Sequence, residues 1–236
     1  MHRNLALFFF SHQLVCCSLF TQHQAQNGDL LAVVANCGDS RLLTDDGSSR
    51  NGAFRQVTRD HRLQDPDERQ RLDALVQQGH AALDYSDGVA QTQQQQRQVL
   101  RLYPGGLAVS RTIGDVDLCK GAIPTPDVYR IPLWQSRLDS TDSTEEVTES
   151  AREEDDDDDG TVRETRTVRF LLASDGLWDV MSNEDVGLLA SSQDPHGKDV
   201  SPAAAVDAVM KECLLRTGGH HDDTTALVVD VKVPRV

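Results

Sequence analysis

The chain has 236 residues, of which 38% are hydrophobic and 26% charged, and its formal net charge is −15. One domain is favoured over two, and the apolar content excludes a wholly disordered chain. Nucleic-acid binding needs a basic surface for phosphate contacts, so we expect no nucleic-acid partner. Five cysteines without a C-x-x-C pair indicate neither a disulfide framework nor a thiolate zinc site. We therefore expect an intracellular protein, either cytoplasmic or nuclear.

An apolar run from Leu5 to Phe20 follows Arg3. Polar residues 11–13 interrupt this run, and it is shorter than the roughly 20 apolar residues that span a bilayer. Membrane association is therefore disfavoured. A signal peptide or anchor over residues 1–20 is the weaker interpretation, because small residues suited to a cleavage site are scarce. The alternatives are a buried strand or helix of the domain, or sequence that does not belong to the native domain.

Two short strands are predicted around a tight turn. The run Leu30–Asn36 is apolar and rich in valine, which is typical of a buried strand, and Ser40–Thr44 returns beside it. Asp39 therefore lies in the connection between two strands.

The middle of the chain combines one helix with extended segments. Residues 54–58 are predicted to be extended, and a helix begins at Asp65-Pro66 and ends at Gly79. Residues 86–98 include a run of glutamines and are predicted to form a surface loop. Three prolines between 124 and 132 keep the next segment extended.

The last part of the chain completes a mixed pattern. Val168–Ser174 is predicted to be a buried strand that Asp175-Gly176 ends. Two helices begin at Ser182 and Ser201, and Thr224–Val233 forms a final strand. This order of strands and helices favours an α+β fold with largely antiparallel pairing.

An acidic segment at 136–167 separates the elements predicted before it from those predicted after it. Residues 139–164 contain thirteen acidic residues and two arginines, a net charge of −11. Like charges repel and leave no apolar face, so we predict a disordered loop insertion. Such runs are usually only solvated chain, but this one could also bind a basic partner or mask a site electrostatically.

Four carboxylates are expected near one end of the sheet. Asp175 follows one strand and Asp222 precedes another, so antiparallel pairing would place both at the same end. Asp39 could join them, and Asp179 lies four residues beyond Asp175. Such a cluster repels itself unless a hard cation such as Mg²⁺ or Mn²⁺ sits among the oxygens. The alternative is that these residues serve only as turn residues or helix caps.

Five further segments carry recognisable motifs: VANCGDSRLL at 34–43, LAVSRTIGD at 107–115, PDV at 126–128, FLLASDGLWDVMSNEDV at 170–186 and DDTTALVV at 222–229. These segments resemble the PPM-type (type 2C) metal-dependent protein Ser/Thr phosphatases. Residues 57–72 also resemble the family's threonine–acid–His segment and the helix after it. All occur in the family's order, over about residues 30–135 and 168–236.

The resemblance implies two packed, mostly antiparallel β-sheets flanked by α-helices, an α-β-β-α sandwich with its metal site at one end. It implies hydrolysis of phosphoserine and phosphothreonine in proteins by a metal-activated water, with two Mg²⁺ or Mn²⁺ ions and a third, weaker one. Asp175 and Asp222 match metal-binding positions of the family. Asp39 and Asp179 match positions associated with the third ion. The partners would be phosphoprotein substrates, and we expect a monomer.

The sequence also departs from the family pattern. The D-G-H-G-G motif with its bridging Asp and general-acid His is absent, and so is the phosphate-binding Arg, so no catalytic residue is assigned. We interpret residues 1–26 as a non-family segment from a misassembled gene. Residues 27–236 are then a partial phosphatase domain, incomplete at its N-terminus and carrying the acidic insertion at 136–167.

Three functions therefore compete. The chain is a Ser/Thr phosphatase, a non-catalytic pseudophosphatase that binds phosphoproteins, or an unrelated acidic cation-binding protein, which the ordered motifs disfavour. With the bridging motif missing, we expect weak Mn²⁺ binding and little or no turnover.

Overall fold

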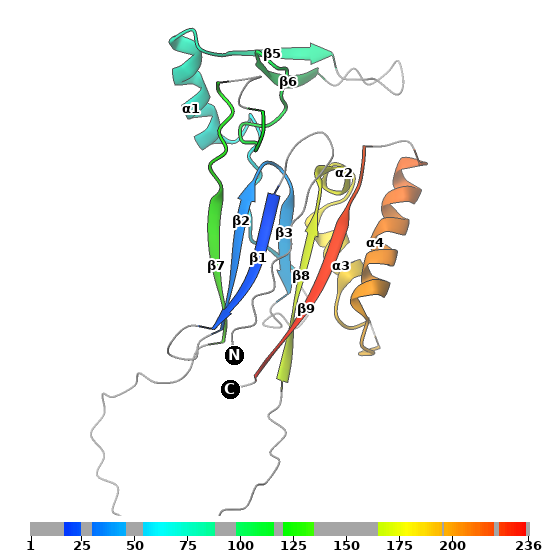
Figure 1. Ribbon diagram of the computed structural model, residues 1–236. Helices are drawn as coiled ribbons and strands as arrows, with labels where there is room; N and C mark the ends of the chain where they lie inside the picture. Colours follow the sequence, from blue (N-terminus) through cyan, green and yellow to red (C-terminus); the bar gives the residue numbers. More distant parts are fainter. Residues whose placement is uncertain are drawn as a thin grey trace, which may run out of the picture.

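The computed structural model describes residues 17–24, 30–45, 54–87, 98–115, 120–134, 165–194, 196–219 and 222–234 (Figure 1). Two antiparallel sheets form its centre. One sheet has the order β1 (Cys17–Gln24), β2 (Leu30–Cys37), β7 (Asp127–Trp134). The other has the order β4 (Arg55–Gln56), β3 (Arg41–Asp45), β8 (Thr165–Ala173), β9 (Ala226–Pro234).

The two sheets pack face to face because apolar residues alternate along their strands. On β8, Phe170 and Leu172 face the other sheet, where they meet Val34 of β2 and Ile131 of β7. Leu171, between them, faces the opposite side. The continuous apolar run of β8 is therefore a strand that is buried on both faces.

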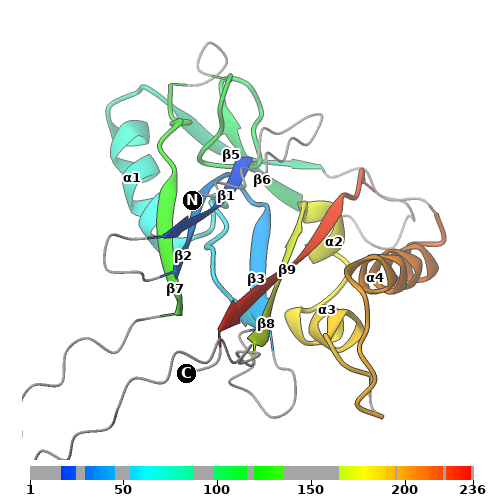
Figure 2. The same cartoon turned by 60° about the horizontal axis from the view of Figure 1, so that its bottom comes forward.

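Three helices cover the outer face of the four-stranded sheet (Figure 2). They are α2 (Asp175–Trp178), α3 (Asn183–Ala190) and α4 (Pro202–Thr217). The predicted caps are confirmed, since Ser182 accepts from the Asp185 N–H and Ser201 accepts from the Ala204 N–H. At the end of α4, Gly218 has a φ of 63°, the left-handed conformation that a glycine adopts without strain.

The remaining helix, α1 (Pro66–Gln77), packs with a hairpin of β5 (Ala82–Asp87) and β6 (Gln98–Tyr103). This unit lies beyond one end of the two sheets (Figure 1). Leu100 and Leu102 of β6 share a small core with Leu72 of α1. The two strands were not predicted, and they take up both edges of the expected loop at 86–98; residues 88–97 lie outside the described residues.

The α+β class and the two packed antiparallel sheets are confirmed. In the described part of the chain, the helical layer lies on the four-stranded sheet, whereas α1 packs with the hairpin. β1 pairs with β2 from Cys17↔Cys37 to Gln24↔Leu30, so the sheet begins before the predicted boundary at residue 27. Among the described residues, no helix combines the length and apolar character that a membrane crossing requires.

The acidic insertion predicted at 136–167 lies outside the described residues up to residue 164. Its last three residues begin β8, where Thr165, Arg166 and Thr167 pair with the end of β9. The strand therefore starts earlier than predicted, because β9 continues far enough to supply partners for their backbone groups.

Candidate metal centre

Strand register brings the predicted carboxylates to one end of the sandwich. β8 pairs antiparallel with β9, and their last pair is Ala173↔Ala226. Just beyond it, the Ser174 N–H donates to the Thr225 carbonyl at 3.0 Å, and the Thr225 N–H donates to Ser174 Oγ at 3.1 Å. Asp175 and Asp222 therefore flank the same closed end of the strand pair, as predicted.

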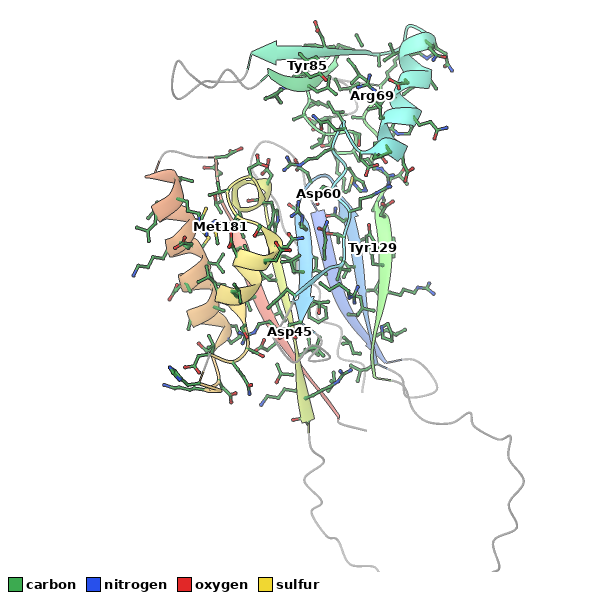
Figure 3. All side chains as sticks on the ribbon, turned by 180° about the vertical axis from the view of Figure 1, so that it is seen from behind. Asp45, Asp60, Arg69, Tyr85, Tyr129 and Met181 are labelled. Atoms are coloured by element: carbon green, nitrogen blue, oxygen red, sulfur yellow. The ribbon has the colours of Figure 1, made fainter. Side chains whose placement is uncertain are left out.

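Asp39 reaches this end from the neighbouring strand. Arg41, the first residue of β3, pairs with Ala173, so the turn before it lies beside the end of β8. Asp39 is only 5% exposed in that turn. Asp60 lies in the same region, at the end of the sheets opposite to Asp45 (Figure 3).

Gly176 allows the chain segment of Asp222 to approach α2 closely. A Cβ placed on Gly176 would lie 2.7 Å from the Asp223 carbonyl oxygen and 2.7 Å from Thr224 Oγ1. No side chain fits there without moving backbone atoms. The glycine of the S-D-G motif therefore sets the spacing between the segments that carry Asp175 and Asp222.

The four carboxylates interact electrostatically. Burial raises the pKa of Asp175, and the negative charges of Asp39, Asp222 and Asp179 raise it further, to about 7. Arg62 opposes this rise. Asp175 thus lies in a region of negative potential that a bound cation would relieve.

The positively charged side chain of Arg62 lies among these carboxylates. Its Nη2 donates to Asp179 Oδ1 at 2.7 Å, and its Nε lies 3.8 Å from Asp39 Oδ2 and 3.8 Å from Asp60 Oδ2. Burial would lower the pKa of Arg62, but the hydrogen bond and the charge of Asp179, with Asp39 and Asp60, raise it. Arg62 therefore stays charged and neutralises part of the cluster.

A second arginine fixes Asp60. Arg41 donates to both oxygens of Asp60, at 3.1 and 2.6 Å, and to Asn183 Oδ1 at 2.6 Å. Its guanidinium also lies 5.0 Å from the centre of the Trp178 ring. This arrangement ties the segment of Asp60 to α2 and α3.

The donor set fits a hard divalent cation in its chemistry, because all four side chains offer carboxylate oxygens and the pKa of Asp175 reports their repulsion. Within the described residues, however, no group of three or more His, Cys, Asp or Glu side chains already converges to hold a metal ion. The four carboxylates therefore do not converge on one point, and the side chain of Arg62 already donates a hydrogen bond to one of them, Asp179.

A buried histidine supports the turn of Asp39. His61 is 0% exposed, and the Gly38 N–H donates to its Nδ1 at 3.0 Å. The proton therefore sits on Nε2, which donates to Asp127 Oδ2 at 3.1 Å. Burial lowers the pKa of His61, so the ring is neutral and holds this turn in place. Asp60 accepts from Arg41, whereas His61 donates to Asp127, so these two adjacent residues do not form an acid–base pair with each other.

Glu68 anchors α1 to the rest of the domain. Its carboxylate is 2% exposed and accepts from Arg111 at 2.9 Å through Nε and from Arg71 at 3.1 Å. Burial would raise the pKa of Glu68, but hydrogen bonds from Arg111, Ser110 and Arg71 outweigh it and lower the pKa to about 2. The carboxylate is therefore charged and satisfied in the folded chain.

We expect Glu68→Gln to lower the free energy of unfolding by about 3 kcal/mol at pH 7. The pKa of Glu68 is lower in the folded than in the unfolded chain, so its stabilisation is complete above about pH 4.5 and is lost as the pH falls toward 2. Urea unfolding at several pH values measures this, and the two curves should converge in acid. Asp67→Asn, in an exposed ion pair, is the control and should cost less than about 1 kcal/mol. Equal stability of Glu68→Gln and the parent at pH 7 would contradict the assignment.

Comparison with known proteins decides the family. The profile of the family described as Protein phosphatase 2C matches residues 13–141, more than half of the chain. The chain belongs to the protein phosphatase 2C family. The match begins at residue 13, upstream of the boundary predicted at residue 27.

Curated phosphatase 2C relatives extend the similarity to most of the chain. Probable protein phosphatase 2C 33 of Oryza sativa subsp. japonica is 32% identical over 199 residues, covering 84% of this chain and 35% of the relative. Probable protein phosphatase 2C 5 of Arabidopsis thaliana is also 32% identical, over 84% of this chain and 35% of the relative. The chain thus spans about a third of the length of these relatives.

Solved structures of other proteins show the same fold. A serine-threonine phosphatase 2C from Toxoplasma gondii matches with a TM-score of 0.52 and 19% identity, over 93% of this chain and 59% of that one. A C. elegans sex determining protein matches with a TM-score of 0.54 and 20% identity, over 91% of this chain and 40% of that one.

Sequence reasoning missed Arg62, Arg41 and His61 as parts of this region. The available signal was adjacency to motifs, since Arg41 ends G-D-S-R and the other two lie in the threonine–acid–His segment. Their roles depend on contacts between segments that lie up to 142 residues apart in the chain, which spacing does not show.

Proposed function

We propose that this chain carries the metal centre of a protein Ser/Thr phosphatase and contributes to hydrolysis of phosphoserine and phosphothreonine in proteins. The observation that carries the proposal is the placement of Asp175 and Asp222 at one closed end of the β8–β9 pair, with Asp39 and Asp179 close enough to raise the pKa of Asp175. Family membership supplies the reaction class.

Asp175 and Asp222 are the residues that would hold Mg²⁺ or Mn²⁺, and Asp39 and Asp179 would supply further negative charge for a weaker ion. When bound, such a cation supplies Lewis-acid polarisation of a phosphoryl oxygen and activates water. The chain positions Asp175 and Asp222 through the Ser174–Thr225 hydrogen bonds and the close approach at Gly176. His61 holds the turn of Asp39 through the Gly38 N–H.

The test is hydrolysis of a phosphothreonine peptide by the chain with Mn²⁺, compared with Asp175→Asn and Asp222→Asn. We expect any hydrolysis and any Mn²⁺ binding to fall at least a hundredfold in both variants, because each removes a carboxylate ligand. Hydrolysis or Mn²⁺ binding that both variants retain at the parent level would contradict the proposal.

A second candidate function is a pseudophosphatase that binds phosphoproteins without turnover. It stays a prediction from the sequence, in which no D-G-H-G-G motif occurs. In the same assay it predicts Mn²⁺ binding that depends on Asp175, without measurable hydrolysis. Binding of a basic partner by residues 139–164 also stays a prediction, because that segment lies outside the described residues.

A further inference from the structure

The carboxylates of the candidate metal centre fall into two pairs that differ in their counter-ions. The outer pair, Asp39 and Asp179, lies within 4 Å of Arg62. The inner pair, Asp175 and Asp222, forms no ion pair with any described residue. The charge of the inner pair is therefore available to an external cation, whereas the charge of the outer pair is shared with the chain itself.

Arg62 binds the outer pair in a way that leaves it displaceable. Among the described residues, its one close contact is from Nη2 to Asp179, whose side chain is 44% exposed. On its other side, the buried Nε forms no hydrogen bond with a described residue and lies 3.8 Å from both Asp39 and Asp60. A buried donor without a hydrogen bond is costly, so the position is maintained by charge rather than by good geometry.

The charge of Arg62 goes mainly to the outer pair. Asp60, the third carboxylate near it, already accepts two hydrogen bonds from Arg41. Asp39 and Asp179 are the other two carboxylates within ion-pair range of Arg62. A divalent cation would need the same oxygens, because both cations interact with carboxylate lone pairs.

We propose that Arg62 is an internal counter-ion that competes with divalent cations for Asp39 and Asp179, so that cations bind the inner pair first and the outer pair only when Arg62 moves away. This inference rests on the proposed function, because it assumes that the inner pair binds a cation. It assigns to Arg62 control over how many cations the centre holds.

The test is calorimetric titration of the whole chain with Mn²⁺, which measures binding without requiring activity. We expect Arg62→Gln to bind Mn²⁺ on the order of tenfold more tightly at the outer pair, or to bind one ion more, because the competing charge is gone. Arg62→Lys should behave like the parent, because it keeps the charge. Adding Asp39→Asn to Arg62→Gln should remove the gain.

Three controls separate this effect from changes in folding or in total charge. Near-UV circular dichroism of each variant checks that the domain is folded, and Arg62→Lys provides a charged variant with a different shape. Arg130→Gln removes one positive charge from the exposed face of β7 and should leave Mn²⁺ binding unchanged.

Three results would overturn the inference. Identical Mn²⁺ affinity and stoichiometry in Arg62→Gln and the parent would reject it while leaving the proposed function intact. A gain that persists after Asp39→Asn would place the added ion elsewhere. Absence of Mn²⁺ binding in all variants would reject the proposed function as well.

Discussion

Asp175→Asn is expected to stabilise the chain in the absence of divalent cations and to abolish its response to Mn²⁺. Burial and three neighbouring carboxylates raise the pKa of Asp175 to about 7, so keeping this group charged at or above pH 7 costs stability. Asparagine removes the charge and keeps an oxygen that can accept from the Gly176 N–H, as Asp175 Oδ1 does at 3.0 Å. We expect the free energy of unfolding to rise by about 1–2 kcal/mol at pH 8.

Mn²⁺ should reverse the relative stability of the parent and Asp175→Asn. A cation that binds only the folded chain stabilises it by about 2.7 kcal/mol at a hundred times its Kd. The parent chain should therefore gain stability in a thermal melt with Mn²⁺, and Asp175→Asn should not. Asp207→Asn, which removes the same charge from an exposed position on α4, should respond like the parent. A destabilised Asp175→Asn in chelator, or an Mn²⁺ shift equal to that of the parent, would contradict the account.

Asp230→Ala is expected to lower the free energy of unfolding by about 3–5 kcal/mol, because it leaves a buried guanidinium without its counter-ion. Arg169 on β8 is 1% exposed and donates to both oxygens of Asp230, at 2.6 and 2.7 Å. Its remaining N–H groups donate to the carbonyls of Ala190, Ser191 and Val200. One side chain therefore joins β8 and β9 to the end of α3 and to the segment before α4.

Urea unfolding at neutral pH measures this loss. Asp73→Ala is the matched control, since Asp73 pairs with Arg69 on the exposed face of α1 and should cost less than about 1 kcal/mol. A loss for Asp230→Ala as small as that of the control would show that Arg169 finds other compensation in the folded chain.

The sequence predicted the part of the centre that depends on strand order. Apolar runs located β2, β8 and β9, and antiparallel pairing of β8 with β9 placed Asp175 and Asp222 at one end. The caps of α3 and α4 followed from single hydroxyl side chains at their starts. These features are local, or need only one pairing, so patterns of residues reveal them.

The features that escaped prediction depend on long-range contacts. Arg62 reaches Asp179 across 117 positions of the chain, and no spacing rule connects the two. The β5–β6 hairpin was missed because its strands are short and polar on one face. Their inner residues are buried by α1 together with Leu63, Leu107 and Ala122, which lie outside the hairpin. The pairing of β1 with β2 was likewise not expected, because residues 1–26 were interpreted as a segment outside the family domain.

The central claim is that Asp175 and Asp222 together hold a divalent cation. Anomalous diffraction at the manganese edge, from crystals of the chain grown with Mn²⁺, tests it most directly. We expect an anomalous peak beside these two carboxylates at the end of β8 and β9, and no such peak for Asp175→Asn. Manganese bound only elsewhere on the chain, with these carboxylates free of it, would contradict the account.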